Sequence, residues 1–140
     1  MEPRISIVTL GVDDLDRAVR FYEALGLKRN EKITDNVAFF QMGGVILALW
    51  PREELARDAG IERPLRGSGM ALAHNTRSAA EVALILDKAA AAGGRVLKAA
   101  NRAFFGGMQG YFEDTEGNLW EVAHNADFPI DAEGRISLPD

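Results

Sequence analysis

The sequence contains no cysteine and only two histidines among its 140 residues. Disulfide bonds, thiolate zinc sites and cysteine nucleophiles are therefore excluded, and so is a histidine-rich metal centre. No apolar run approaches the ~20 residues needed to span a bilayer, and no signal peptide is visible before the first strand-like segment. We therefore expect a cytoplasmic protein with no membrane partner.

Positive charge is also scarce. Lys and Arg number 16 against 21 Asp and Glu, giving a net charge of −5, and the two signs are interspersed. A nucleic-acid surface would need a basic stripe, so we expect no nucleic-acid partner. Gly106-Gly107 lacks the following Lys-Ser/Thr of a phosphate loop, and no serine has the context of a nucleophile elbow. The length and the 47% hydrophobic content predict one globular domain.

Hydrophobic periodicity predicts short strands and two longer helices. Gly43-Gly44 separates two apolar runs, which indicates a hairpin. Ser78 and Glu81 have the spacing of a capping box that begins a helix. The predicted helices cover 13–25 and 78–92, with a shorter helical excursion within 51–67. The predicted strands cover 5–12, 37–42, 45–50, 70–74, 95–99, 107–112 and 119–123.

The order strand, helix, hairpin and further strand occurs twice. We therefore predict an α+β fold with two βαβββ modules, at about 1–60 and 68–126, followed by an extended tail at 127–140. Each module is too small to bury its sheet face alone, so the two should form a single domain over residues 1–140.

Two segments carry a family resemblance. TLGVDDLDRAVRFYEALG (9–26) resembles the opening of the vicinal-oxygen-chelate superfamily, which includes glyoxalases, bleomycin resistance proteins and extradiol dioxygenases. YFEDTEGNLWEVAHN (111–125) resembles its closing signature. The resemblance covers essentially the whole chain. It implies sheets that curve into a cup with the helices on the convex side, and it says little about the reaction, because site chemistry varies within one fold.

The resemblance also implies where a divalent metal ion would bind, namely on the first and last strands of each module. Those positions fall on Ile7, Leu47, Met70 and Glu121. Only Glu121 carries a side chain that binds such an ion well. A one-residue change of register brings in only aliphatic, glycine or serine side chains. We therefore expect neither a metal site nor another cofactor.

Glu121 is the candidate catalytic residue. It lies in an otherwise apolar strand, and an isolated buried carboxylate is costly. One interpretation is a general base, or an anchor for a ligand's donor group, inside an apolar cup. The other is a carboxylate that reaches solvent or pairs with a cation such as Arg102 or Lys98.

The remaining candidate residues are assigned to ligand binding. The predicted apolar wall of the cup comprises Ile7, Leu47, Leu49, Met70 and Leu72. His74 has the strand parity of Met70 and Leu72 and is expected to face the same cup, either as an acid/base or as a strand-end residue bonded to the backbone.

The loop before the strand at 107–112 is expected to lie over the mouth of the cup, because two bulky rings precede several glycines. It contributes Phe105 and Gln109, with Tyr111 following in the strand. The alternative is a core aromatic stripe and a bulged strand start.

Three functions follow from these assignments. The first is a protein that binds a small, largely apolar molecule, either to sequester it or to act on it without metal through Glu121. The second is a metal-dependent lyase, isomerase or dioxygenase of the glyoxalase type with a degenerate metal site. The third is a structural, dimerising protein with a filled cup. In each case we expect a homodimer, because small curved sheets have exposed edges.

Overall fold

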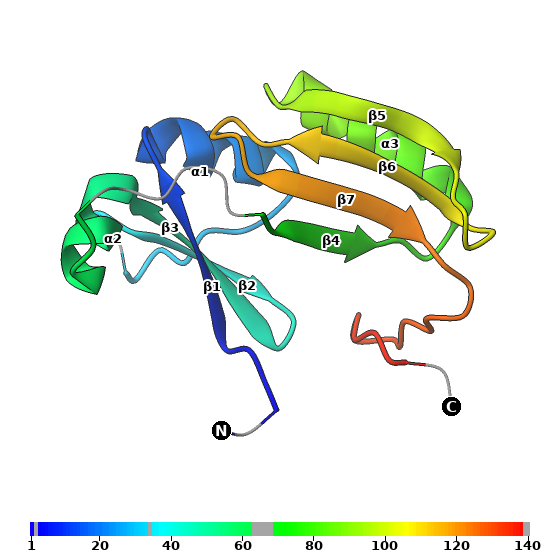
Figure 1. Cartoon of the computed structure of the whole chain (residues 1–140), viewed down its shortest axis with the longest axis horizontal. Helices are drawn as coiled ribbons and strands as arrows, with labels where there is room; N and C mark the ends of the chain where they lie inside the picture. Colours follow the sequence, from blue (N-terminus) through cyan, green and yellow to red (C-terminus); the bar gives the residue numbers. More distant parts are fainter. Residues whose placement is uncertain (2, 34, 63–68, 139–140) are drawn as a thin grey trace.

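The computed structural model describes residues 1, 3–33, 35–62 and 69–138 (Figure 1). No helix in these ranges is long and apolar enough to cross a membrane. The elements, in chain order, are β1 (Ile7–Val12), α1 (Leu15–Ala24), β2 (Ala38–Met42), β3 (Val45–Pro51), α2 (Arg52–Ala59), β4 (Ala71–Asn75), α3 (Ala79–Ala91), β5 (Arg95–Arg102), β6 (Met108–Glu113) and β7 (Leu119–His124).

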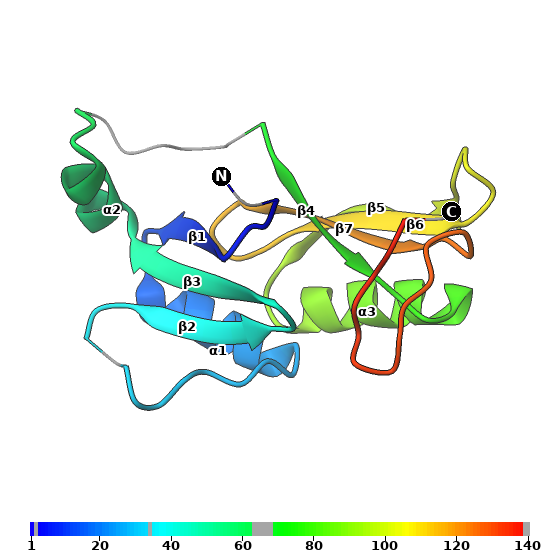
Figure 2. The same ribbon diagram turned by 90° about the horizontal axis from the view of Figure 1, so that it is seen from below.

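The strands form two mixed sheets, in the orders β1-β3-β2 and β4-β7-β6-β5. In each sheet the first strand pairs in parallel with the last strand of its module, and the other pairs are antiparallel. Helix α3 packs on β5, β6 and β7, and α1 contacts β3. In Figure 2 both helices lie on the same side of the sheets. The predicted α+β class is confirmed.

The first module has three strands where the predicted βαβββ pattern has four. The place beside β2 is taken by an isolated bridge between Arg29 and Phe40. Here the Asn30 amide N–H donates to the Phe39 carbonyl (2.8 Å), and the Asn30 side chain then accepts from the amides of Lys32 and Ile33 (2.9 and 3.2 Å). An Asn side chain that bonds the backbone ahead of it turns the chain. This turn ends the pairing after one bridge.

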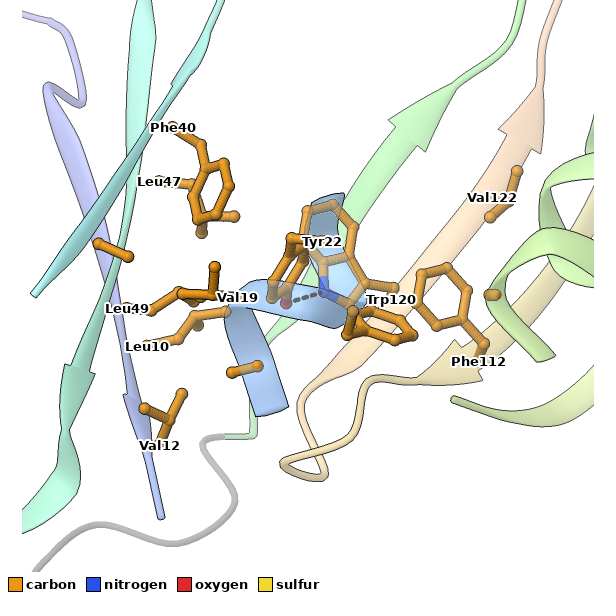
Figure 3. Close-up of a cluster of buried hydrophobic side chains, with 14 of the residues drawn as sticks. Leu10, Val12, Val19, Tyr22, Phe40, Leu47, Leu49, Phe112, Trp120 and Val122 are labelled. Carbon is orange, nitrogen blue, oxygen red and sulfur yellow. Dashed lines mark hydrogen bonds between the residues drawn. The ribbon is translucent and has the colours of Figure 1, made fainter. Parts of the chain in front are cut away.

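Helix α1 connects the two modules in one hydrophobic core. Val19 and Tyr22 face Leu49 of the first sheet, and Tyr22 also contacts Trp120 of the second (Figure 3). The ring of Trp120 lies parallel to that of Phe112, with centroids 6.1 Å apart. Shared aromatic burial therefore holds the modules together.

The β6–β7 turn adds a polar connection to this core. Asp114 is 4% exposed, and its Oδ2 accepts hydrogen bonds from the Tyr22 hydroxyl (2.6 Å) and the Asn118 side chain (2.8 Å). Its Oδ1 accepts from the amides of Glu116 (2.9 Å) and Asn118 (2.8 Å). The Tyr22 hydroxyl in turn accepts from the Trp120 indole N–H (3.1 Å). One buried carboxylate therefore fixes both its own turn and a ring of the other module.

Glu116 in the same turn binds the start of α1. Its Oε2 accepts from the Asp13 amide (2.7 Å), and its Oε1 receives Arg17 through both Nε (2.9 Å) and Nη2 (2.7 Å). An anion at a helix N-terminus interacts favourably with the unpaired amides and the helix dipole. The acidic signature DTEG, read as a turn in the sequence, is thus also an inter-module clamp.

The chain after β7 is not extended as predicted for 127–140; as far as residue 138 it folds back on itself. Ile130 and Ile136 form an antiparallel bridge. Arg77 donates through Nη1 to the Ile130 carbonyl (3.1 Å) and through Nη2 to the Asp131 carbonyl (2.6 Å). This C-terminal hairpin therefore rests on its own chain.

Candidate functional site

The face of the second sheet opposite α3, here called the open face, carries a row of functional side chains. Strand register places Ala73 beside Glu121, Glu121 beside Tyr111, and Tyr111 beside Lys98. Partners on neighbouring strands point to the same side of a sheet, at spacings of about 4.8 Å per strand. The row therefore runs from small Ala73 through a carboxylate and a phenol to an ammonium group.

The row is electrostatically coupled. The pKa of the Tyr111 phenol is raised, first by burial, then by the charge of Glu121 and by a hydrogen bond with that carboxylate. The Lys98 ammonium lies 6.0 Å from the centroid of the Tyr111 ring. Tyr111 therefore stays protonated at neutral pH, with its hydroxyl available to donate to the neighbouring Glu121 carboxylate. The row offers a ligand an oriented carboxylate acceptor at one end and a cation at the other.

The neighbouring row supports this geometry. Gln109 is buried on β6 between Ala123 on β7 and Asn101 on β5. The Asn101 amide group donates to the carbonyls of Gln109 (3.2 Å) and Ala99 (2.8 Å). These bonds hold β5 where its pairing with β6 is irregular.

A tyrosine titration tests the coupling in the row, because the chain has only two tyrosines, Tyr22 and Tyr111. Both phenols have pKa values raised above the usual 10, Tyr22 through burial and then the charge of Asp114. We expect Glu121→Gln to lower the pKa of Tyr111 and to leave Tyr22 unchanged, as followed by phenolate absorbance in the wild type and in Tyr22→Phe. An unmoved Tyr111 midpoint would mean that Glu121 does not contact it.

The first sheet presents an apolar counterpart on its own face opposite α1. Ile7, Ile46 and Phe39 lie there, because Ile7 pairs with Ile46, and Phe39 alternates with the buried Phe40. With Gln41 and the segment after α1 they line a cavity of about 360 Å³. Ile7 is 49% exposed, so this face is available to a ligand or a partner.

Several predicted wall residues lie elsewhere. Leu47 and Leu49 are buried in the core on the α1 side of the first sheet, away from Ile7 (Figure 3). Leu72 and His74 share a face, as predicted, but it is the α3 side, opposite Glu121: they pair with Trp120 and Val122, which pack in the core. The expectation that these residues line one cup together with Ile7 and Glu121 is therefore wrong, although Leu47, Leu72 and His74 do line a common cavity of about 540 Å³. Met70 precedes β4 and is 46% exposed.

The predicted loop lies between β5 and β6. The rings of Phe104 and Phe105 pack edge to face, with centroids 5.3 Å apart, and Phe104 is 97% exposed. Gln109 and Tyr111 do share the open face with Glu121. The sequence indicates Lys98 only as a salt-bridge partner of Glu121. It does not predict that Lys98 lies beside Tyr111, because the register shift in β5 breaks simple alternation.

Residues 4–122 match the family described as the glyoxalase/bleomycin resistance protein/dioxygenase superfamily. The chain belongs to this superfamily. No curated protein matches it. The match to the family confirms the resemblance predicted from the sequence.

Solved structures extend the match over the whole chain. A glyoxalase-related enzyme from Fulvimarina pelagi is 37% identical, with a TM-score of 0.93 and 99% of each chain covered. Lactoylglutathione lyase from Agrobacterium tumefaciens is 27% identical, with a TM-score of 0.68 over 88% of this chain and 94% of that one. The fosfomycin resistance protein FosX from Mesorhizobium loti is 17% identical, with a TM-score of 0.65 over 90% and 94%, and shows the fold alone.

Superfamily membership raises the question of a metal ion. Of the four expected ligand positions, Ile7, Leu47 and Met70 offer no oxygen or nitrogen donor, and only Glu121 does. Nowhere in the described ranges do three His, Asp or Glu side chains come close enough to hold an ion. One carboxylate is far from the ligand set that a divalent cation needs. The residues present do not fit the metal, and no chemical step is assigned to one.

Proposed function

We propose that this glyoxalase-superfamily protein binds a small, largely apolar organic molecule on the open face, with Glu121 as its polar anchor. The observation that carries the proposal is the Lys98–Tyr111–Glu121 row, in which strand register sets the phenol beside the carboxylate. The first sheet presents apolar surface of its own at Ile7, Ile46 and Phe39. A few placed polar groups against apolar walls are typical of ligand sites.

The row suits either sequestration or proton transfer. Glu121 can accept a hydrogen bond from the ligand, or a proton from an acidic C–H or O–H group, with the Tyr111 phenol beside it. Lys98 can stabilise negative charge that develops on the ligand. Both roles use the side chains of this chain and need no metal.

Native mass spectrometry of freshly purified, untagged protein tests the proposal. We expect a retained small molecule in the wild type, lost in Glu121→Gln, which keeps the shape and removes the charge. The matched control is Glu113→Gln, on the same face one row away, where Arg95 pairs with the carboxylate at 2.6 Å. Equal retention in both variants would contradict the proposal.

Calorimetric titration with zinc, nickel, manganese and iron(II) tests the rival metal-dependent function. A single carboxylate with water should bind only in the millimolar range, so we expect no stoichiometric micromolar site. A tight site with one ion per chain that disappears in Glu121→Ala would favour the glyoxalase-type enzyme instead.

We also propose a homodimer. Strands β1 and β4 each end a sheet and have a neighbour on one side only among the described strands. Exposed sheet edges and apolar patches are commonly covered by a second copy of the chain with twofold symmetry. The patch at Ile7 is such a surface. Light scattering behind a sizing column should give twice the chain mass at tens of micromolar. A monomeric mass would reject the dimer, and an unchanged dimer after deletion of 127–140 would reject only a role for the C-terminal segment.

A further inference from the structure

A second cavity lies on the helix side of the molecule, away from the open face. We call it the inter-module crevice. It has a volume of about 240 Å³ and lies between the residues that end α1, the α3 helix and the second sheet. Its floor is aromatic, formed by Tyr22, Phe112 and Trp120, and Figure 3 shows Trp120 between the other two rings. Leu25 and Ile85 are among its walls.

The floor is fixed and nearly buried: Trp120 is 8% exposed, Phe112 2% and Tyr22 1%, so Trp120 presents most of what a ligand could touch. The Tyr22 hydroxyl is bonded to Asp114 (2.6 Å) and the Trp120 indole N–H to Tyr22 (3.1 Å), so both polar atoms are already satisfied. The Trp120 and Phe112 rings lie within 1° of parallel. A preorganised aromatic surface favours a flat apolar group, because little entropy is lost on binding.

Two nitrogen-bearing side chains line the same crevice, His74 from β4 and Lys88 from the last turn of α3. No described carboxylate forms an ion pair with Lys88. Burial lowers the pKa of His74, against a smaller raising effect from Glu81, so the imidazole is neutral at pH 7 and keeps one N–H to donate. The Oε2 of Glu81 accepts from the Arg77 amide (3.1 Å), at the start of α3.

The size of the crevice sets the class of molecule. Benzene fits an apolar cavity of about 150 Å³, so about 240 Å³ accommodates a larger ring system. Met42, His74 and Trp120 also line a neighbouring cavity of about 540 Å³ that reaches the C-terminal hairpin. A longer apolar group can therefore continue past His74.

We propose that the inter-module crevice is a second ligand site, for a monocarboxylate with a flat apolar body. The ring system lies on the Tyr22–Phe112–Trp120 floor, and the carboxylate meets Lys88 and the His74 N–H. The site is independent of Glu121, which lies on the opposite face of the sheet.

The test uses 2-naphthoate as the probe and 2-naphthamide as its neutral counterpart, with amide and indole NMR signals as the readout. The chain has two tryptophans, so the Trp120 indole signal reports on the crevice while Trp50 serves as an internal control. We expect naphthoate to shift Trp120 but not Trp50. Lys88→Met should weaken naphthoate roughly threefold to tenfold, as for a partly exposed charge-assisted bond, and leave naphthamide unchanged.

Matched substitutions on α3 separate the crevice from the surface. Ile85→Trp fills the cavity and should abolish binding, whereas Leu84→Trp, at an exposed position one residue away, should not. Glu121→Gln should leave naphthoate binding intact, which distinguishes this site from the open face. No Trp120 shift at 5 mM probe, equal effects of the two tryptophan variants in folded protein, or loss of binding in Glu121→Gln would each overturn the proposal.

Discussion

Replacing Asp114 by alanine should lower the free energy of unfolding by about 3–5 kcal/mol, the range for breaking a buried, charged network. The change removes the acceptor for four hydrogen bonds. The Tyr22 hydroxyl and the amides of the turn then lose their acceptor. Because Asp114 is only 4% exposed, water cannot easily replace it. For a domain of this size the melting temperature should fall by about 10 °C or more.

Urea denaturation followed by circular dichroism measures this effect, and two milder variants calibrate it. Tyr22→Phe removes one of the four bonds and also the acceptor of the Trp120 indole N–H, and it should cost about 1–3 kcal/mol. Asp114→Asn keeps an acceptor oxygen and should fall between the two. If Asp114→Ala unfolds within 1 kcal/mol of the wild type, the turn does not hold the modules together.

The Tyr22–Asp114 hydrogen bond also makes the stability of the protein depend on pH in the alkaline range. The folded-state pKa of Tyr22 is raised well above 10, the approximate value in the unfolded chain. Above pH 10 the unfolded chain therefore loses its proton first, and stability falls as pH rises through this window. Tyr111 contributes with the same sign. Tyr22→Phe should flatten the larger part of this decline.

Local rules explain what the sequence could predict. The strand–helix order, the turn at Gly43-Gly44 and the helix that follows Ser78 depend on neighbouring residues, and the structure has each of them. The sequence also predicts that Glu121, Tyr111 and Gln109 share one face, because β6 and β7 are joined by a short turn that fixes their register.

Choosing between the two faces of a strand requires tertiary information. The sequence correctly predicts that Leu47 and Leu49 share a face, and that Leu72 and His74 do, yet each pair lies on the helix side of its sheet and not on the side of Ile7 or Glu121. In β1 and β3 both faces are apolar, with Ile7 and Ile46 on one and Leu47 on the other. Period-2 alternation then cannot say which face an unseen helix covers.

Other differences arise from single side chains that act over distance. The missing strand depends on the turn made by Asn30, and the folded C-terminal hairpin depends on Arg77, more than 50 residues away along the chain. The place of Lys98 in the row depends on an irregular register in β5. None of these leaves a periodic signal in the sequence.

The second large effect is expected at Gly110, which lies in β6 between Gln109 and Tyr111 and faces α3. A Cβ atom there would lie 2.9 Å from the Lys98 carbonyl oxygen and 3.3 Å from the Ala100 nitrogen, and it would press on the Leu86 side chain. Leu86 can rotate, but the β5 backbone must move. Gly110→Ala should therefore cost about 1–3 kcal/mol, the range for overpacking a core.

The displacement should also reach the functional row, because the carbonyl that must move belongs to Lys98, the partner of Tyr111. We expect the Tyr111 pKa to change in Gly110→Ala, measured by phenolate absorbance alongside urea denaturation. The matched control is Gly44→Ala in the β2–β3 turn, where an added Cβ meets no atom within 4 Å and no left-handed backbone is required. That variant should lie within about 1 kcal/mol of the wild type. If the two alanine variants are equally stable, β5 and α3 do not close on Gly110, and the geometry that aligns Lys98 with Tyr111 and Glu121 must be looser than the register implies.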